Sequence, residues 1–343
     1  MTRVLFVGDV RPWTRTEQRL RALRQLVEHV DVVPTEPDDG APPGTRRPSL
    51  RARVARRLGR PLDATNAVRG AQAVLDRGDV DLLWIEKALA LDPALVADAR
   101  VPAVFVSEDD MAQRHNQSRN FRAALPHYRL VVTTKPRNAG PLGLARIGAR
   151  RVLVLPKAFD PELHRPRVVT QFERQAFGSE LAFVGTYEAP RARSLSRLAD
   201  AGFDVRVWGN GWRGRRVSPR LRVEGRAAHG LDYGLVLNAS LVHLGFLRRA
   251  NGDLSTGRSV EVPAAGAFLL TERTTEHSAL FREGVEAEFF GDDDELSSKA
   301  RAALRDPVRR ATIAAAGRRR VLDDERSHET AVRRILAALE DTP

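Results

Sequence analysis

The sequence contains no cysteine and no long apolar run. Without cysteine, disulfides, thiolate metal ligands and a cysteine nucleophile are excluded. The apolar runs are all too short to cross a bilayer. The first ten residues, MTRVLFVGDV, enter a strand pattern directly and lack the apolar stretch and small-residue cleavage site of a signal peptide. We therefore expect a cytoplasmic protein.

Lysine and aromatic residues are also scarce. Four of the 56 basic residues are lysine, so the net charge of +12 comes almost entirely from arginine, and a GC-rich genome is the bland explanation of that preference. Proteins that bind single-stranded nucleic acid usually interleave basic residues with aromatic side chains for base stacking. With 6% aromatic residues the sequence gives no such signal, and we do not expect a nucleic-acid partner.

The length and the strand pattern predict two domains. A chain of 343 residues is longer than one hydrophobic core usually organises. Its first half opens with an apolar strand pattern (3–10), a helical stretch (14–30) and a second strand pattern (31–36), which predicts a parallel sheet with crossover helices. Four further strands are expected at 80–86, 102–108, 129–134 and 151–156.

A second alternation of strands and helices follows a stretch without a clear period. Its strands are expected at 180–188, 204–210, 221–225, 239–246, 266–272 and 287–291, and residues 295–339 look helical throughout. We divide the chain into a Rossmann-like domain (1–165), a linker (166–178), a second Rossmann-like domain (179–323) and a final helix (324–343), for which packing against the first domain is one option. Two such domains place a cleft between the carboxyl ends of their strands.

The segment 251–272, NGDLSTGRSVEVPAAGAFLLTE, carries the densest chemical signal. A polar, glycine-containing loop leads into a short helix, whose N-terminus offers backbone N–H groups to a diphosphate. Thr256 and Arg258 lie at that point, and the guanidinium adds a charge that binds phosphate with two donors. Glu261, further along the helix, suits ribose hydroxyls. An equally open interpretation makes Glu261 a solvated helix charge and Asp253 an N-cap.

Five segments of the second half appear in a familiar order and spacing. They are LAFVGTYEAPRARSLSRL, VRVWGNGW, VEGRAAHGLDYGLVLNASLVHLGF, RSVEVPAAGAFLLTE and HSALFREGVEAEFFGDDDEL. On these segments, residues 181–339 resemble the C-terminal half of the glycosyltransferases that include glycogen and sucrose synthases, and most closely their CgeB-like (spore-maturation) branch. The resemblance implies the α/β GT-B fold, in which two doubly wound Rossmann-like domains face each other across a cleft.

The resemblance also assigns roles to residues of the second half. Glu261 matches the glutamate that holds the donor ribose, and Asp253 occupies the place of a glutamate near the transferred sugar. An aspartate has a shorter reach, so the catalytic role of this residue and the identity of the sugar stay open. The other donor-binding positions are Gly185, Thr186, Tyr187, Arg191, Gly209, Asn210, Thr256, Gly257 and Arg258, with Arg193 as an alternative to Arg191. For these two helix arginines the competing interpretation is an exposed basic helix, and Trp208 and Trp212 are expected in the core.

In the first half the likeness is less specific and rests on residues 107–125 and 131–166. Polar residues follow two apolar strand patterns there and are expected to project at the carboxyl end of the sheet, where an acid or an imidazole can orient or deprotonate an acceptor hydroxyl. The candidates for catalysis are Asp109, Asp110 and His115, and those for the acceptor pocket are Glu86, Lys87, Glu108 and Asn116. The competing interpretation makes Asp109 or Asp110 a helix N-cap and His115 a surface residue.

The expected reaction is transfer of a hexose-like sugar from a nucleoside diphosphate to an acceptor that the sequence does not identify. Breaking the anomeric C–O bond places negative charge on the β-phosphate, which arginines and a helix N-terminus stabilise. No metal or other cofactor is then required, and the resemblance implies retention of configuration. The acidic run Asp292, Asp293 and Asp294 is interpreted as solvated. A nucleotide-sugar epimerase with this fold and a nucleotide-sugar binding protein without catalysis, suggested by Asp253, are the alternatives.

The stretch 46–60, RRPSLRARVARRLGR, spaces Leu50, Val54 and Leu58 at helical intervals between arginines. Such a stripe can lie on an anionic membrane surface, but more often it packs on the sheet of its own domain. We expect the second arrangement and no stable membrane attachment. The expected partners are therefore a nucleotide-sugar and an acceptor molecule.

Overall fold

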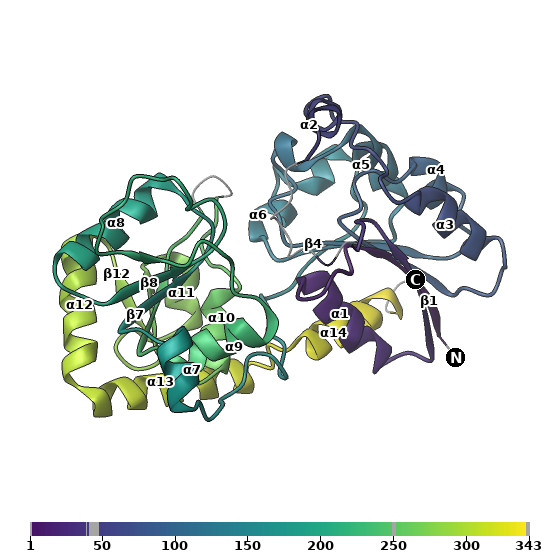
Figure 1. Cartoon of the computed structure of the whole chain (residues 1–343). Coiled ribbons are helices and arrows are strands. Elements are labelled where there is room, and N and C mark those ends of the chain that lie inside the picture. The colour runs from purple at the N-terminus through teal and green to yellow at the C-terminus, as the bar shows by residue number, and fades with distance from the viewer. Residues whose placement is uncertain (1, 39, 41–47, 249–251, 341–343) are drawn as a thin grey trace. The chain divides into compact units, whose positions relative to one another are not determined.

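The computed structural model describes residues 2–38, 40, 48–248 and 252–340, and its contacts divide the chain into two units (Figure 1). The first unit comprises residues 1–156 and 328–343, and the second comprises residues 157–327. Each unit contains one sheet of six strands, and all of the strand pairs are parallel. The doubly wound α/β architecture expected from the sequence is therefore confirmed.

The first sheet has the strand order β2-β1-β3-β4-β5-β6. Its strands are β1 (Arg3–Gly8), β2 (His29–Pro34), β3 (Leu82–Glu86), β4 (Ala103–Ser107), β5 (Leu130–Thr133) and β6 (Val152–Val154). Central strands of a parallel sheet are covered on both faces, so they are apolar along their whole length. In β1, Val4 and Phe6 enter one core, while Leu5 and Val7 enter the core on the opposite face.

Helices cover both faces of this sheet. On one face α1 (Arg15–Arg24) and α14 (His328–Glu340) lie side by side, and their Leu20, Leu23, Val332 and Ile335 share a core with the strands (Figure 1). The remaining helices of the unit are α2 (Leu50–Arg57), α3 (Ala67–Leu75), α4 (Pro93–Ala97), α5 (Arg119–Ala124) and α6 (Pro136–Ala139), with short 3-10 turns at Arg114–Asn116, Leu125–His127 and Leu144–Ile147.

The second sheet has the strand order β12-β11-β10-β7-β8-β9. Its strands are β7 (Leu181–Val184), β8 (Val205–Trp208), β9 (Arg222–Val223), β10 (Val242–Gly245), β11 (Leu269–Glu272) and β12 (Glu288–Phe290). From β7 the chain proceeds outward to β8 and β9, and from β10 it proceeds outward in the other direction. The order therefore reverses between β7 and β10, and ligands of open α/β sheets bind at such a switch point.

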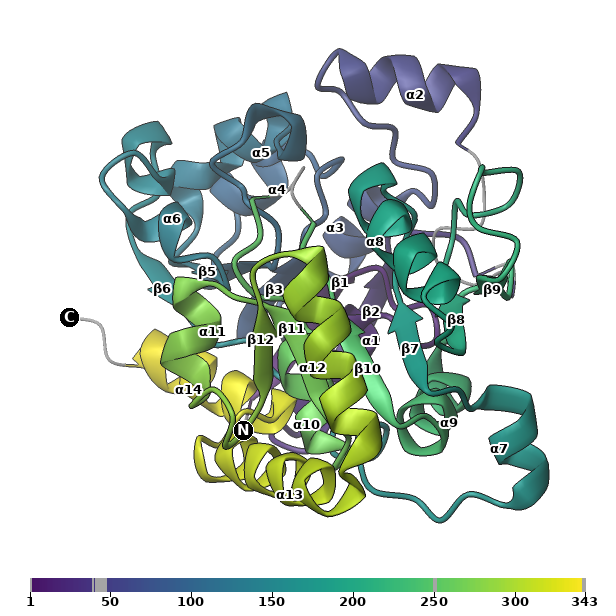
Figure 2. The ribbon, with the colours of Figure 1, turned by 90° about the vertical axis from the view of Figure 1, so that its left-hand side faces the viewer.

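Two groups of helices enclose the second sheet. One core contains α8 (Ala189–Asp200) and α12 (Asp293–Arg305), and Figure 2 shows α12 crossing in front of β10 and β11. The core on the other face contains residues of α9 (Gly230–Ala239), α10 (Arg258–Ala264) and α13 (Pro307–Asp323). Two shorter helices, α7 (Gln171–Phe177) and α11 (Thr275–Leu280), complete the unit. None of the helices in the described ranges has the length and apolar character that a bilayer crossing requires.

Two helical boundaries differ from the sequence expectations. The first helix ends at Arg24 instead of continuing to residue 30, because His29 already pairs with Arg3 in the ladder between β1 and β2. The tail is not helical throughout. Pro307 has no backbone N–H and occupies the first turn of α13, so α12 ends before it. A second break separates α13 from α14.

The residues expected as a linker, 166–178, lie within the second unit. They include α7, whose start is fixed by a capping box in which Thr170 and Glu173 satisfy each other's backbone N–H groups. The first unit ends at Pro156 rather than at residue 165, and the chain returns to it at His328.

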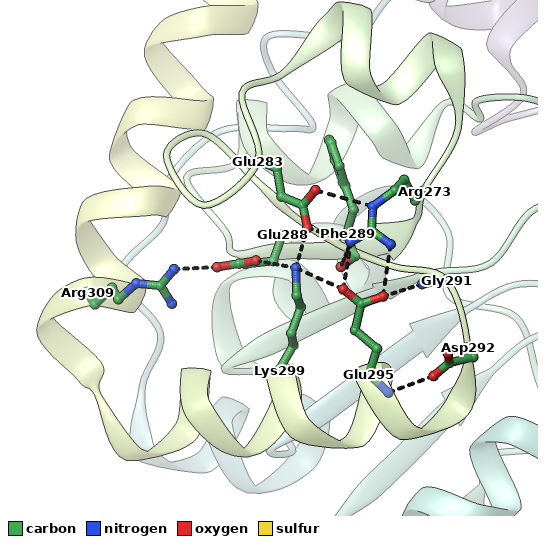
Figure 3. A network of polar contacts seen from close by, with 9 residues as sticks. All are labelled: Arg273, Glu283, Glu288, Phe289, Gly291, Asp292, Glu295, Lys299 and Arg309. Atoms are coloured by element: carbon green, nitrogen blue, oxygen red, sulfur yellow. Dashed lines mark hydrogen bonds and ion pairs between the residues drawn. The ribbon is translucent and has the colours of Figure 1, made fainter.

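A network of charged side chains connects β11, β12, α12 and α13 at one side of the second unit (Figure 3). Arg273, which follows β11, donates to Glu283 and to Glu295 at 2.7 and 2.6 Å. Lys299 contacts three glutamates, and Arg309 donates to Glu288 at 2.5 Å. Bonds from Arg273 are the largest cause that lowers the pKa of Glu295, to about 2. The network ties the last two strands of the sheet to the helices that follow them.

Candidate functional site

The carboxyl ends of β7 and β10 bring together the residues that the sequence singled out in the second unit. Gly185 follows β7, and Phe246 follows β10. Arg258 is the first residue of α10, at the end of the loop that begins after β10. These ends flank the switch in strand order, where the crevice of a doubly wound sheet opens.

Arg258, Tyr233 and Glu261 form a connected group at the end of β7. The Nε of Arg258 donates to the carbonyl of Val184 at 3.1 Å, and its guanidinium lies 5.7 Å from the ring centroid of Tyr233. The Tyr233 hydroxyl donates to Oε2 of Glu261 at 3.1 Å. Glu261 is 4% exposed, so its interpretation as a solvated helix charge is wrong. We call this set the Arg258 group.

The start of α10 is fixed by a chain of hydrogen bonds from β11. Nδ1 of His277 lies 2.7 Å from the carbonyl of Glu272, and because a carbonyl only accepts, Nδ1 carries the proton. Nε2 of a neutral ring then accepts from Ser259 Oγ at 2.8 Å, and that oxygen accepts the N–H of Thr256 at 3.1 Å. Burial lowers the pKa of His277, in agreement with a neutral ring.

This arrangement changes the expected phosphate site. The N–H of Thr256 is bonded within the protein, and the N–H groups of Ser259, Val260 and Glu261 are bonded within the first turn of the helix. The N-cap of α10 is Gly257, which makes no side-chain cap, so Asp253 is not the N-cap of this helix. The Arg258 side chain is a positive group that α10 presents at the end of β7.

Two glycine turns, at 185–187 and 209–211, are in direct contact. The N–H of Tyr187 donates to the carbonyl of Asn210 at 2.9 Å. A Cβ at position 209 would lie 1.9 Å from the carbonyl oxygen of Gly185, so no other residue fits there without movement. The indole of Trp212 donates to that same oxygen at 2.9 Å, and Trp208 and Trp212 are both buried, as expected.

Arg191 holds the loop after β7 against the loop after β10. One Nη donates to the carbonyl of Thr186 at 2.9 Å, and the other donates to the carbonyl of Leu247 at 2.8 Å and to Glu188 at 3.2 Å. The residue is 7% exposed, so the expectation of an exposed helix arginine is wrong at this position. Burial is the largest cause that lowers the pKa of Arg191, and Arg258 and Arg248 lower it further. Glu188 and Glu272 act in the opposite direction on this pKa, and Glu188 pairs with both Arg191 and Arg248.

His229 is the residue directly before α9, and it lies near the Arg258 group. Burial lowers the pKa of His229, and the nearby charge of Arg258 lowers it further. Asp253 is half-buried, and its N–H donates to the carbonyl of Arg248 at 3.4 Å. Residues 249–251, the start of the motif around Asp253, lie outside the described ranges.

A polar cavity of about 490 Å³ opens between the N-terminal ends of α8 and α12. Its lining includes Glu188 and Leu247 from the loops after β7 and β10, Arg191 of α8, and Glu272 at the end of β11. Of the acidic run expected to be solvated, Asp292 caps α12 by accepting from the N–H of Glu295 at 2.8 Å, and Asp293 pairs with Arg197 at 2.7 Å.

In the first unit, the glutamates at the carboxyl end of the sheet are engaged with α1. Arg19 donates to both oxygens of Glu86 at 2.8 Å and to Glu108 at 2.6 Å, and Arg15 donates to Glu108 at 2.9 Å. The indole of Trp84 donates to Glu86 at 3.1 Å. Burial alone would raise the pKa of Glu108, but the two arginines outweigh it and hold that pKa far below its usual range. Both glutamates therefore act as ion-pair partners.

The loop after β4 holds the remaining acceptor-side candidates. Asp109 forms an ion pair with Lys87. Asp110 is buried and accepts from the N–H of Ala112 at 3.2 Å and from Gln113 Nε2 at 2.7 Å, which stabilises the turn. Asn116 is also buried and donates to the carbonyl of Asp110 at 3.0 Å, whereas His115 is exposed. The competing interpretation is confirmed for His115, which is a surface residue, but not for Asp109 or Asp110, because the N-cap residues of the helices that follow are Gln113 and Ser118.

Sequence reasoning missed Tyr233, His229, Ser259 and His277. Tyr233 and His229 lie in one of the segments on which the resemblance rests, but their distance from Arg258 along the sequence does not indicate that they lie near it in the fold. Ser259 and His277 are ordinary helix residues until the fold places α10 and α11 together.

Comparisons with known proteins support the fold described above. Residues 191–337 match a family model described as glycosyl transferase-like. The chain superposes over 99% of its length on 99% of sucrose-phosphate synthase from Thermosynechococcus elongatus, with a TM-score of 0.67 and 14% identity. A second similar structure is that of Anabaena HepE in complex with UDP-glucose. The match covers 100% of each of the two chains, with a TM-score of 0.64 and 15% identity.

A third structure is a putative UDP-N-acetylglucosamine 2-epimerase from Listeria monocytogenes. Here 99% of the chain matches 97% of the epimerase, with a TM-score of 0.59 and 14% identity. Identities this low establish the fold alone, and that fold is GT-B. No curated protein sequence matches the chain.

Proposed function

We propose that the protein transfers a sugar from a nucleoside diphosphate to an acceptor hydroxyl, because residues 191–337 match a family model described as glycosyl transferase-like and the chain has the GT-B fold. Within that family we assign it to the CgeB-like branch, on the order and spacing of the five segments between residues 181 and 296. The donor proposed is a UDP-sugar, since the solved relatives include HepE bound to UDP-glucose.

The observation that supports the proposal most directly is the Arg258 group. Its guanidinium is held by a carbonyl and an aromatic ring, which are neutral partners, so its positive charge is available to a diphosphate. Glu261 is a buried carboxylate that Tyr233 keeps at the same strand end, a suitable acceptor for ribose hydroxyls. A cation and a carboxylate fixed together at the switch point match the two ends of a nucleoside diphosphate.

The chemistry proposed at this site is stabilisation of the leaving group. As the anomeric C–O bond breaks, charge accumulates on the β-phosphate, and Arg258 stabilises that charge without reorganising. Arg191 acts as a positioning residue, because it fixes the carbonyls of Thr186 and Leu247 on both sides of the switch. We further propose that Asp253 faces the transferred sugar, that no metal ion is required, and that the configuration of the sugar is retained, as the family resemblance implies.

The donor assignment is tested by calorimetric titration of the full chain with UDP. Substituting R258Q removes a charge-assisted contact to phosphate, which is expected to weaken UDP binding about 100-fold. E261A is expected to weaken UDP binding as well, but to leave the affinity for inorganic pyrophosphate unchanged, since the carboxylate meets ribose. R193Q changes an exposed arginine on α8 and is the matched control. Equal UDP affinity in R258Q and R193Q would refute the assignment.

An epimerase is the second candidate, supported by the likeness to the putative Listeria enzyme. The two reactions differ in their products. A transferase releases UDP in amounts that increase when an acceptor is added, whereas an epimerase converts the sugar of UDP-N-acetylglucosamine. Chromatography of the nucleotides after incubation with UDP-glucose and with UDP-N-acetylglucosamine separates the two. Binding of either nucleotide-sugar without turnover over a broad acceptor panel would instead support a binding protein.

A further inference from the structure

Helix α2 presents its large apolar side chains to solvent. None of its eight residues is buried. Leu50 is 72% exposed, Val54 is 49% exposed, and Leu58, at its C-cap, is 61% exposed. Ala52 and Ala55 are half-buried, so the helix turns its smallest side chains inward. The expectation that this stripe packs on the sheet of its own domain is therefore wrong.

Both ends of α2 are fixed, so this orientation is set by the fold. Ser49 caps the N-terminus by accepting the N–H of Ala52 at 3.1 Å. At the other end, the carbonyl of Gly59 accepts the N–H of Arg119, the first residue of α5, at 2.8 Å. Figures 1 and 2 both show α2 at the outer extremity of the first unit.

The segment that carries the stripe has charges of one sign. Five arginines, and no acidic residue, lie between residues 50 and 62. At 100° per residue, Arg57 and Arg53 flank one side of the stripe and Arg51 flanks the other. All three are exposed. We call Leu50, Val54 and Leu58 with these three arginines the α2 surface. Arg46 and Arg47, at the start of the basic stretch, lie outside the described residues.

The chemistry of the α2 surface selects its partner. A second copy of the chain would bring like charges together, because each copy carries the same arginines on the same face. A bilayer with anionic headgroups offers both complements, negative phosphates for the guanidinium groups and an apolar region beneath them for leucine and valine. The long arginine stems allow the charged ends to stay at headgroup level while the stripe inserts.

We propose that α2 docks the protein on the surface of an anionic lipid bilayer. The helix lies parallel to the membrane plane, with the stripe directed into the acyl boundary and the arginines among the headgroups. Three apolar side chains and a few charges form a single small anchor, so the attachment is reversible. The expectation of no stable membrane attachment depended on the stripe packing against its own sheet, and this proposal replaces it with reversible docking.

The test is co-sedimentation of the full chain with lipid vesicles. Vesicles of mixed phosphatidylcholine and phosphatidylserine are expected to bind the protein, and vesicles of phosphatidylcholine alone are not. The triple substitution L50Q, V54Q and L58Q is expected to lower the partition coefficient at least tenfold, and R51Q with R53Q to lower it about fivefold per arginine. These side chains are exposed, so the variants keep their core.

The second unit supplies matched controls. V168Q, F172Q and V308Q change three apolar side chains that are 99%, 77% and 76% exposed, and R305Q with R319Q changes two exposed arginines. Both control variants are expected to bind anionic vesicles as the unchanged protein does. UDP binding by every variant is measured in solution, which separates failure of the docking proposal from failure of the donor site.

Three outcomes would overturn the proposal. The first is absence of binding to anionic vesicles. The second is equal loss in the α2 and control variants, which would indicate attraction by overall charge. The third is a dimer in light scattering that the α2 triple substitution abolishes, which would make a second copy the occupant of the surface.

Discussion

The two units treat arginine at the carboxyl end of their sheets in opposite ways. In the first unit, Arg19 lies between Glu86 and Glu108, and both of its partners are carboxylates. In the second unit, Arg258 is held by a carbonyl and a tyrosine ring, whereas Arg191 bonds to two carbonyls and also pairs with Glu188. The arrangement around Arg19 neutralises the charge of the arginine, and the arrangement around Arg258 positions the arginine without neutralising it.

This difference indicates which unit binds the anion. A guanidinium that bonds to neutral acceptors keeps its full charge in a partly desolvated place, where an incoming phosphate is attracted strongly. A guanidinium between two carboxylates is a structural part of its unit, and removing it leaves buried charges behind. Substitution of Arg19 is therefore expected to affect stability, and substitution of Arg258 to affect binding.

The largest effect is expected at Arg19. R19M keeps the volume but removes the charge, leaving Glu86 and Glu108 without their shared partner in a place where Glu86 is 1% exposed at its side chain. Breaking a buried pair in this way typically destabilises by about 3–5 kcal/mol. Urea unfolding measures the change. R333Q breaks a surface pair with Glu329 on α14 and is expected to change stability by less than about 0.5 kcal/mol.

A small effect of R19M, similar to that of R333Q, would show that the network in the first unit is hydrated. Burial of ion pairs would then not explain the different roles of arginine in the two units. A loss of UDP affinity in R19M with unchanged stability would contradict the division of roles more seriously, because it would place Arg19 in the donor site.

Acid is expected to weaken the second unit before the first. Burial lowers the pKa of His243 to about 4, from an unfolded value of 6.5. Between these values the unfolded chain binds more protons, so stability falls as the pH drops from 6.5, by up to about 3 kcal/mol near pH 4. The pKa of Glu108 is instead depressed, so its contribution is present above the ordinary carboxyl range and is lost only below pH 4.5.

Urea unfolding between pH 7 and pH 4.5 measures this difference. H243Q removes the titrating group, and its stability is expected to change less steeply over that range than the stability of the unchanged protein. Identical slopes for the two proteins would mean that the pKa of His243 is the same in the folded and unfolded states, against its burial on β10.

The sequence predicted the sheets well because parallel strands are apolar along their length. All twelve expected strand segments overlap observed strands, and the errors lie where another element overrides local propensity, as at His29 and Pro307. Arg258 and Glu261 were also found from the sequence, because a loop, a short helix and their spacing carry that signal locally.

The partners of these residues were not predictable in the same way. Tyr233 precedes Glu261 by 28 positions, and Arg19 precedes Glu86 by 67, so neither contact leaves a periodic trace in the sequence. The sequence suggested Glu86 and Glu108 as acceptor-side acids, because it does not reveal that arginines of α1 pair with them in the fold. Side-chain partners across the sheet, and the inward face of α2, are properties of packing.

A smaller effect is expected at Arg191, which sharpens the contrast within the second unit. R191K keeps the charge but has one nitrogen, so it cannot bond to the carbonyls of Thr186 and Leu247 together. We expect UDP affinity to fall about tenfold, close to 1.4 kcal/mol, because the two loops lose their common partner. Calorimetry measures the affinity, with R193K as the control. An unchanged affinity would show that the loops hold their positions without Arg191.

The smallest effect is expected in the network around Arg273. Its charges are balanced as those around Arg19 are, but its side chains are exposed, so it tests whether balanced charge or burial sets the stability that such a network provides. Like Arg19, Arg273 lies between two carboxylates, Glu283 and Glu295, but these three side chains are 30 to 39% exposed. E295Q removes one of the carboxylates. If the pairing of one arginine with two carboxylates were enough to explain the stabilisation expected in the first unit, E295Q would destabilise the protein by several kcal/mol as well. Because water screens exposed pairs, we expect about 0.5–1 kcal/mol in urea unfolding. A loss comparable to that of R19M would show that connectivity, rather than burial, gives such networks their strength.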